Sequence, residues 1–346
     1  MAGARLRVRA AAGPGRAVVL QLGRGVPQRH LGAGRRAARR LQEARPPPRI
    51  RPSRVRTTVI EQQNAVVVTG SSGRLGRAVV EHLLATGVPV VGIDLEGPPA
   101  PGFRVHTMAI RDPGALRPVF RGARAVIHLA AMPNPRAGPG HTIYTVNTTA
   151  TYAVLDAALA EGVPRVVTAS SGAVLGISSG PRELSPLYAP VDEEHPVRPQ
   201  DGYALSKQAD EAACAMFHRS TGLSVAALRF PAIGTPELLR ERVRRERAEP
   251  GFLRRGLWAY VEVRDLARAF AAAVTAEGIG WEVFAVAAAD TLSEIPTEEL
   301  LRRHHPGTAL RGSLPGCASV WDVSKAGRML GWQPGYTWRE AEHVPV

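Results

Sequence analysis

The stretch "AVVVTGSSGRLGRAVVEHLLATG", residues 65–87, decides the fold class of this chain. It opens with a short β-branched run that ends at Gly70, which is the pattern of a buried strand. From Arg74 onward, apolar residues recur at helical spacing until Gly87 marks the end of a helix. The stretch therefore predicts a strand, a tight turn and a helix in direct succession.

The same alternation continues along the chain. Four further apolar runs have the length and composition of buried strands: 88–95, 123–131, 163–171 and 223–230. Helical patterns lie between several of them, for example at 144–162 and 203–220. Because strands that alternate with helices imply right-handed crossovers, we predict an α/β protein with a doubly wound parallel sheet.

The chain has a net charge of +14, and this charge is concentrated at one end. Residues 1–58 contain fifteen arginines and one acidic residue, Glu43, whereas 59–346 contain equal numbers of basic and acidic side chains. The leader lacks Phe, Trp and Tyr, so it cannot bury enough apolar surface to become ordered. We therefore expect a disordered basic leader over 1–58 and a neutral folded core that does not bind nucleic acid.

Three interpretations of the leader stay open. Its composition suits a nucleic-acid-binding arm, or an Arg-rich targeting peptide, although Ser53 is its single serine. The third interpretation is an over-long start in a GC-rich gene, with translation beginning near Val55 or Val59.

The remaining composition favours a cytoplasmic protein. No run of about 18 apolar residues occurs, so the sequence predicts no membrane-spanning helix. Cys214 and Cys317, the two cysteines, form neither a metal-ligand spacing nor a disulfide framework. Since His128 and His195 belong to no metal-spaced cluster, we expect structural roles for both and no metal site.

The turn "TGSSGRLG", residues 69–76, is the first candidate site. Gly70, Gly73 and Gly76 form a GxxGxxG array between the predicted strand and helix. There, backbone N–H groups and the helix dipole can receive a diphosphate, which a Cβ atom would obstruct. We interpret the array as a dinucleotide-binding turn; an ordinary strand-to-helix turn is the alternative.

Two aspartates are candidate contacts for the rest of the dinucleotide. Asp94 ends the second predicted strand, 18 residues after Gly76, where a carboxylate can accept hydrogen bonds from both ribose hydroxyls. A 2′-phosphate would meet a like charge there, so NAD is favoured over NADP, although Arg74 would partly favour a phosphate. Asp112, in "RDPGAL", either contacts the adenine amino group or caps a helix.

The segment "YALSK", residues 203–207, is the second candidate site. The chain has only six tyrosines and two lysines, yet Tyr203 and Lys207 are four residues apart in a helical pattern, on one face. A phenol, with a pKa of about 10, is a poor base at neutral pH unless nearby cations stabilise the phenolate. With that help it can take an alcohol proton while hydride leaves carbon, or return a proton to a carbonyl.

A third group must hold the substrate oxygen. Ser170 and Ser171 follow a predicted parallel strand, at the edge where α/β sheets bind ligands. Taken alone, a serine pair at this position is typical of a turn.

These pieces together resemble one family. From about residue 64 to 338 the chain resembles the extended short-chain dehydrogenase/reductases, specifically the NAD-dependent epimerase/dehydratase family. The resemblance rests on "TGSSGRLG", Asp94, "HLAA" (128–131), Asn147, "SSGAVLG" (170–176), "YALSK", "LRFPAIG" (228–234), "YVEVRDLARAF" (260–270) and "LGWQP" (330–334).

The resemblance implies a Rossmann-type fold and assigns roles to the candidate residues. It makes Tyr203 the acid/base and Ser171 the matching hydroxyl, while Lys207 binds the nicotinamide ribose and makes the phenol more acidic. Together with the turn residues, the expected cofactor-binding set is Gly70, Ser72, Gly73, Arg74, Leu75, Gly76, Asp94, Asp112, Leu129, Ala130, Ala131, Asn147, Tyr203, Lys207 and Pro231.

The expected organisation has two regions after the leader. An NAD-binding domain with the catalytic residues covers 59–235. A smaller substrate-binding region over 236–346 is interleaved with the last strands of the sheet, and we expect 187–203 to form a loop over the substrate. A homodimer formed through paired helices is common in the family.

The chain departs from family members that act on nucleotide sugars. Leu175 stands where those enzymes usually have a tyrosine, and 237–257 is shorter than the structure they insert there. These departures favour a uronate-type or other small sugar substrate over a UDP-sugar. Three arginines are candidate anion-binding groups, although a solvated face is the favoured interpretation for them: Arg254, Arg255 and Arg264.

The sequence thus predicts an NAD-dependent oxidoreductase that transfers hydride at a secondary alcohol of a sugar or sugar-derived substrate, as a dehydrogenase or an epimerase. The alternative is a non-catalytic, dinucleotide-sensing protein on the same fold. The presence of Tyr203, Lys207 and Ser171 argues against that alternative, because a sensor does not need all three.

Overall fold

The computed structural model describes residues 63–97 and 103–341. The expected leader, 1–58, lies outside the described residues.

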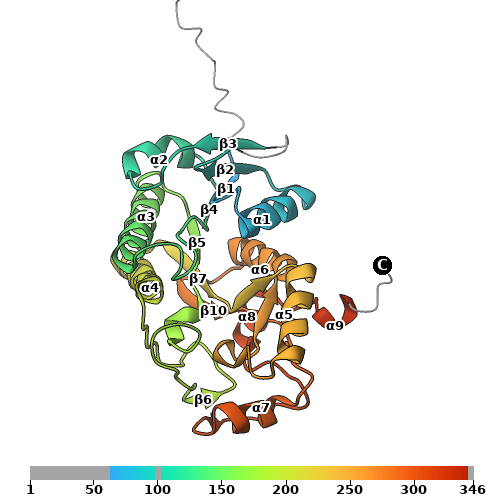
Figure 1. Ribbon diagram of the computed structural model, residues 1–346. Coiled ribbons are helices and arrows are strands. Elements are labelled where there is room, and N and C mark those ends of the chain that lie inside the picture. The colour runs from blue at the N-terminus through green and yellow to red at the C-terminus, as the bar shows by residue number, and fades with distance from the viewer. Residues whose placement is uncertain (1–62, 98–102, 342–346) are drawn as a thin grey trace, which may run out of the picture. The chain divides into compact units, whose positions relative to one another are not determined.

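Seven strands form one parallel sheet in the order β10-β7-β5-β4-β1-β2-β3 (Figure 1). Their bounds are Val66–Thr69 for β1, Val90–Asp94 for β2, Arg104–Thr107 for β3, Ala125–His128 for β4, Arg165–Ala169 for β5, Ser224–Arg229 for β7 and Trp281–Ala285 for β10. The doubly wound parallel sheet predicted from the sequence is confirmed. Strand β10 comes from the C-terminal region of the chain and forms one edge.

Helices cover both faces of the sheet, as Figure 1 shows. The helices that cover it are Arg74–Ala85 (α1), Val263–Thr275 (α6) and Ser324–Leu330 (α8) on one face, and Pro113–Phe120 (α2), Gly140–Ala160 (α3) and Gly202–Thr221 (α4) on the other. Strand β1 explains the two cores, because successive side chains of a strand point to opposite faces. Val66 and Val68 pack with α1 and α6, whereas Val67 packs with α2, α3 and α4.

The remaining elements are short and lie outside the main sheet. They are Gly172–Leu175 (η2), Tyr188–Ala189 (β6), Ala232–Gly234 (β8), Pro236–Ala248 (α5), Arg254–Gly256 (η3), Tyr260–Glu262 (β9), Thr297–His304 (α7), Ala309–Leu310 (β11) and Trp338–Ala341 (α9). Strand β8 pairs with β9, and β6 pairs with β11, both in parallel. The proposed division of the chain near residue 235 stays a prediction.

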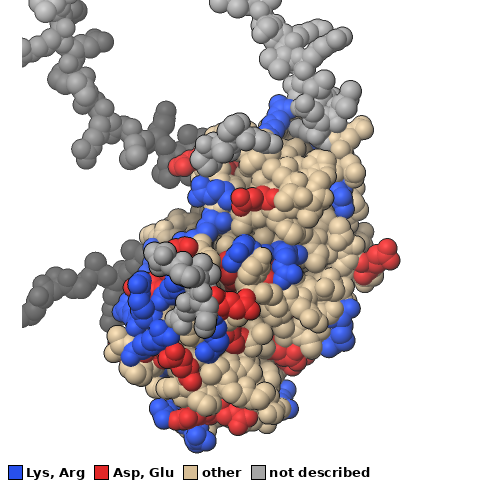
Figure 2. Space-filling view, turned by 90° about the vertical axis from the view of Figure 1, so that its right-hand side faces the viewer, with Lys and Arg blue, Asp and Glu red and all other residues tan. Residues whose placement is uncertain are grey.

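The sheet topology places a ligand site at the carboxyl end of its central strands. Strand β1 lies between β2 and β4, so the order of strands reverses there. In open parallel sheets, this reversal opens a crevice beyond the strand ends. Figure 2 shows basic and acidic side chains interspersed on one face of the molecule. Across the described ranges, no helix is long and apolar enough to cross a bilayer.

Candidate active site

A cavity of about 1400 Å³ opens at the carboxyl ends of β1, β2, β4, β5 and β7. Pockets for a single drug-sized ligand measure about 300–1,000 Å³, so this cavity has room for a dinucleotide and a second small molecule. It is lined by most of the sequence-predicted residues: Gly70, Ser72, Gly73, Arg74, Leu75, Gly76, Asp94, Leu129, Ala130, Ala131, Ser171, Tyr203, Lys207 and Pro231.

The glycine turn has the close packing that the GxxGxxG pattern predicts. Gly70 has a φ of +72°, and a Cβ atom there would lie 2.7 Å from the backbone nitrogen of Ala130. A Cβ at Gly76 would overlap the Gly70 carbonyl. Gly73 is the N-cap of α1 and supplies no side-chain hydrogen bond, so the N–H groups of the first turn stay open toward the cavity. The turn therefore fits a diphosphate group.

Asp94 holds the turn and faces the cavity. Its Oδ2 accepts a hydrogen bond from the Ser72 backbone N–H at 2.8 Å, and its Oδ1 accepts one from Leu95 at 2.7 Å. A carboxylate has about four lone-pair sites, so it can still accept the hydroxyls of a ribose. Its negative charge disfavours a 2′-phosphate at the same place.

Two expected cofactor contacts do not line the cavity. Asp112 is the N-cap of α2, and its Oδ1 accepts the Gly114 N–H at 2.9 Å. Of the two alternatives for this residue, the structure thus shows the helix cap, while Ile110 and Arg111 line the cavity beside it. An adenine contact by Asp112 stays a prediction.

Asn147 is the other residue outside the lining. It is buried in α3, where Oδ1 accepts the Met132 N–H at 2.8 Å and Nδ2 donates to Ser206 Oγ at 3.0 Å. Ser206 in turn donates to the Tyr203 carbonyl at 2.7 Å. Asn147 therefore fixes a cavity wall against α4, and its expected contact with the cofactor stays a prediction.

Tyr203 and Lys207 lie in the first two turns of α4 and face the cavity. Asp201 caps this helix by accepting the Ala204 N–H at 2.8 Å, which fixes where the helix begins. Both side chains are buried, and Lys207 Nζ lies 3.1 Å from Asp210 Oδ2. Burial lowers the pKa of Lys207, but the charges of Asp210 and Tyr203 outweigh it, so the pKa is raised. The ammonium charge is thus maintained beside the phenol.

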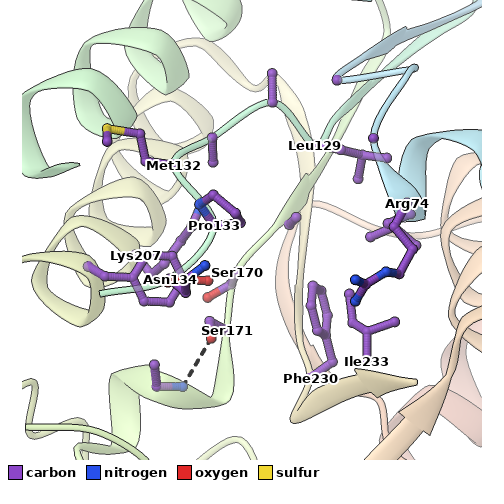
Figure 3. Close-up of a pocket in the computed structure, with 18 of the residues that line it drawn as sticks. Arg74, Leu129, Met132, Pro133, Asn134, Ser170, Ser171, Lys207, Phe230 and Ile233 are labelled. Atoms are coloured by element: carbon purple, nitrogen blue, oxygen red, sulfur yellow. Dashed lines mark hydrogen bonds between the residues drawn. The ribbon is translucent and has the colours of Figure 1, made fainter. Parts of the chain in front are cut away.

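The structure separates the two serines by role. Ser170 Oγ donates to Glu211 Oε1 at 2.5 Å, and Glu211 also holds Arg229 through two hydrogen bonds. Ser171 Oγ accepts the Ala173 N–H at 3.1 Å and caps η2, which leaves its hydroxyl hydrogen available to a substrate oxygen (Figure 3). Ser170 is anchored in the fold, whereas Ser171 is free to donate.

The substrate end of the cavity is formed by residues around η2 and η3, including Leu175, Gly180, Arg255 and Leu257. Leu257 has a φ of +56°, and the next residue, Trp258, has a φ of +52°. This left-handed backbone is unfavourable for side chains of their size. Because Trp258 Nε1 donates to buried Glu246 at 2.7 Å, the surrounding structure fixes this conformation.

Of the three candidate arginines, Arg255 lines the cavity. Its Nη2 donates to the Gly180 carbonyl at 2.7 Å, and its buried Nε has no partner among the described residues. Arg254 pairs with Glu183 at 2.7 Å, and Arg264 pairs with Glu262 at 3.0 Å, both outside the lining. One cation is therefore available at the substrate end.

Of residues 187–203, expected as a loop over the substrate, only Tyr203, which lies on α4, lines the cavity. Val191 and Ala189 instead pack in the core beside Trp321. His195 is buried there and accepts the Leu187 N–H at 3.0 Å through Nε2. Loops from 175 to 180 and from 255 to 257 cover this end of the cavity instead.

His128 has the structural role expected for it. Its Nδ1 lies 2.8 Å from Thr69 Oγ1 and its Nε2 lies 3.2 Å from Thr151 Oγ1. Burial, with a smaller effect of the Lys207 charge, lowers the pKa of His128 to about 3. Within the part of the chain that the structure describes, no group of three or more His, Cys, Asp or Glu residues could hold a metal ion.

Sequence reasoning missed two cavity features. Arg242 of α5 lines the cavity although it is 168 residues from Arg74 in the chain, and only the tertiary fold brings it there. Asp210 is the ion-pair partner of Lys207. Its position three residues after the lysine on a helix was a signal that could have identified it.

Comparison with known proteins identifies the family. The model of the NAD dependent epimerase/dehydratase family matches residues 66–287, and the chain belongs to this family.

Several of the proteins that the chain resembles have sugars or nucleotide sugars in their names or in their solved structures. L-arabinose 1-dehydrogenase (NAD(P)(+)) of Haloferax volcanii is 32% identical over 56% of this chain and 76% of its own. UDP-glucose 4-epimerase 4 of Oryza sativa is 31% identical over 48% of each chain, so this match spans about half of that enzyme. MoeE5, solved with UDP-glucose and NAD, is 26% identical with a TM-score of 0.59, over 80% of this chain and 96% of its own.

Proposed function

We propose that this protein transfers hydride between NAD and a secondary alcohol of a sugar or sugar-derived substrate. The observation that supports the proposal is that Tyr203, Lys207 and Ser171 line one cavity together with the glycine turn and Asp94. The turn would hold the diphosphate of NAD, and Asp94 its adenosine ribose. Bound there, NAD would supply the hydride acceptor.

Each catalytic residue has one task in this reaction. Ser171 donates a hydrogen bond to the substrate oxygen. Tyr203 would take the O–H proton of the substrate alcohol, and with bound NAD as acceptor of the C–H hydride the product would be a ketone or a lactone. Lys207 holds the nicotinamide ribose and stabilises the phenolate with its charge. In the reverse direction, Tyr203 returns the proton to the carbonyl oxygen.

The substrate we favour is a free or acidic sugar. Leu175, in the short helix that Ser171 caps, presents an apolar side chain to the cavity, and the loops from 175 to 180 and 255 to 257 line the same end. Arg255 offers a guanidinium to a carboxylate or phosphate. The dehydrogenase activity of the Haloferax relative on a free pentose agrees with a small substrate. We also propose a cytoplasmic location, as Cys214 and Cys317 are both free.

A substrate screen tests this proposal. The full chain is incubated with NAD and with sugars, uronates, sugar phosphates and nucleotide sugars, and NADH absorbance and product stereochemistry are followed. Accumulating NADH identifies a dehydrogenase, and an epimer formed without NADH identifies an epimerase. Tyr203→Phe should abolish either activity and retain NAD affinity; unchanged turnover in this variant would contradict the assignment. NAD binding without turnover of any substrate would favour the dinucleotide-sensing alternative.

We further propose that the protein forms a homodimer through α3 and α4. These helices pack on each other at the surface of the sheet. Exposed apolar side chains lie on both of them: Tyr144, Tyr152 and Leu159 on α3 and Leu205 on α4. A two-fold interface would cover these side chains.

A further inference from the structure

Two arginines from distant parts of the chain line the same cavity. Arg74 is the first residue of α1 and extends from the glycine turn toward Ile233 of β8 (Figure 3). Arg242 lies on α5 and lines the same cavity. Burial lowers the pKa of Arg242, and the charge of Arg74 adds to this effect. The two positive charges thus act on one another within the same cavity.

Neither arginine side chain forms an ion pair with an acidic residue of the described ranges, although Asp94 and Glu96 also line the cavity. Within 63–97 and 103–341, Arg74 and Arg242 make no hydrogen bond or ion pair. The neighbouring Arg244, on the outer face of α5, pairs with Glu241 at 2.5 Å. Arg74 is exposed and Arg242 is half-buried, so solvent screens part of their repulsion, and an anion bound between the two groups would be attracted by both charges.

The helix that carries Arg242 is fixed in place. Leu239, Val243 and Glu246 form its buried stripe, and Arg242 lies at the edge of this stripe that faces the cavity. Glu246 accepts hydrogen bonds from the N–H groups of Gly251 and Leu253, both at 2.8 Å, and from Trp258 Nε1. The guanidinium of Arg242 is thus presented by an anchored helix.

We infer that Arg242 and Arg74 bind the diphosphate of the dinucleotide on the side away from the glycine turn. This inference rests on the proposed use of NAD. The open N–H groups of α1 would bind one side of the diphosphate, and two guanidinium groups, which suit phosphate oxygens, would bind the other. The inference does not concern the 2′-phosphate of NADP, which is attached to the adenosine ribose. The negative charge of Asp94 disfavours a phosphate at that position.

The test compares ligands with and without a diphosphate. Binding of ADP-ribose is measured by calorimetry, and binding of adenosine by competition, for the wild type, Arg242→Gln, Arg74→Gln and Arg244→Gln. We expect Arg242→Gln and Arg74→Gln to weaken ADP-ribose binding by about 10- to 100-fold. Adenosine binding should not change, and the control Arg244→Gln should behave as the wild type. Arg242→Lys, which retains the charge, should keep most of the affinity.

Two outcomes would overturn the inference. Unchanged ADP-ribose affinity in Arg242→Gln, with an increased KM for an anionic substrate, would assign the arginines to the substrate. Equal losses of affinity for ADP-ribose and for adenosine would show that the substitution disturbs the structure of the whole site. Circular dichroism and the melting temperature of each variant reveal misfolding directly. Failure of the wild type to bind ADP-ribose would instead contradict the proposed use of NAD.

Discussion

Lys207 Nζ lies 3.1 Å from Asp210 Oδ2, and both side chains are buried on the same face of α4. The second oxygen of Asp210, Oδ1, is buried without a hydrogen-bond partner among the described residues. Lys207, for which we propose a catalytic role, is thus paired with a carboxylate within its own helix. This pair maintains an ammonium charge at a position where burial alone would favour the neutral amine.

Asp210→Asn should reduce both stability and activity. Burial is already the largest single influence on the pKa of Lys207, and removing the carboxylate removes much of what opposes it, so this pKa falls. Breaking a buried ion pair costs about 3–5 kcal/mol, which denaturant unfolding measures. Because the amine then loses its proton at lower pH, the alkaline limb of the kcat/KM profile should shift to lower pH. Asp156→Asn, an exposed site on α3, is the control; an unshifted profile would contradict a role for Asp210 in maintaining the charge.

The two adjacent serines should respond differently to substitution by alanine. Ser171→Ala removes the hydroxyl that we assign to the substrate oxygen, so kcat should fall by about 10²- to 10³-fold with little change in melting temperature. Ser170→Ala removes a hydrogen bond to Glu211 and should cost about 1–3 kcal/mol of stability with a smaller loss of kcat. Steady-state kinetics and thermal unfolding of both variants measure these effects. A larger loss of kcat in Ser170→Ala, with a larger loss of stability in Ser171→Ala, would show that the two serines have the opposite roles.

Asp94→Ala should change cofactor preference. The substitution removes the carboxylate that favours an unmodified ribose, so NAD should bind about tenfold more weakly and the ratio of NADP to NAD affinity should rise. Ser72 and Leu95 would also lose an acceptor for their N–H groups, so the melting temperature is measured in parallel. A fixed NADP to NAD ratio would show that Asp94 does not contact the ribose.

His128 should make the fold less stable in acid. Its pKa is lowered to about 3 in the folded state, so between about pH 6.5 and 3 the unfolded chain binds a proton that the folded chain does not. Stability therefore rises with pH in this window, by about 1.4 kcal/mol per unit in its steepest part. The slope of unfolding free energy against pH should be smaller in His128→Gln than in the wild type. Equal slopes would mean that other groups dominate the acid response.

Tyr152→Glu should dissociate the proposed dimer. The side chain is 50% exposed on α3 and contacts Phe217 of α4 edge to face, with ring centroids 5.1 Å apart. A charge at the centre of a two-fold interface would meet its own copy, which is unfavourable. Light scattering should then show a monomer, while Arg328→Glu on α8, away from these helices, should leave the dimer intact. A wild-type monomer would contradict the proposal directly.

Local patterns made most of the fold predictable. One continuous stretch of sequence contains the strand 66–69, the turn and the helix 74–85. In each element, the spacing of apolar residues is characteristic of that type of structure. The positions of Tyr203 and Lys207 on one face follow from the same helical periodicity. Asp112 was ambiguous because one sequence, "RDPGAL", suits both a helix cap and a ligand contact.

Long-range packing accounts for what the sequence did not show. Arg242 reaches the cavity because Leu239 and Val243 pack α5 beside β8, and neither contact has a local signature. Residues 187–202 were misplaced because their Pro-rich, acidic composition suits a surface loop, whereas Val191 and His195 are buried among residues far away in the chain. Such pairings depend on the whole fold.

Glu246 has a kinetic consequence for the proposed reaction. Its carboxylate ties α5, which carries Arg242, to the loop that carries Arg255 and Leu257. A dinucleotide bound to Arg242 would hold α5 in place and, through Glu246, would also hold the loop that the sugar contacts. We therefore expect compulsory-order kinetics in which NAD binds first, with NADH as a competitive inhibitor against NAD and a noncompetitive one against the sugar.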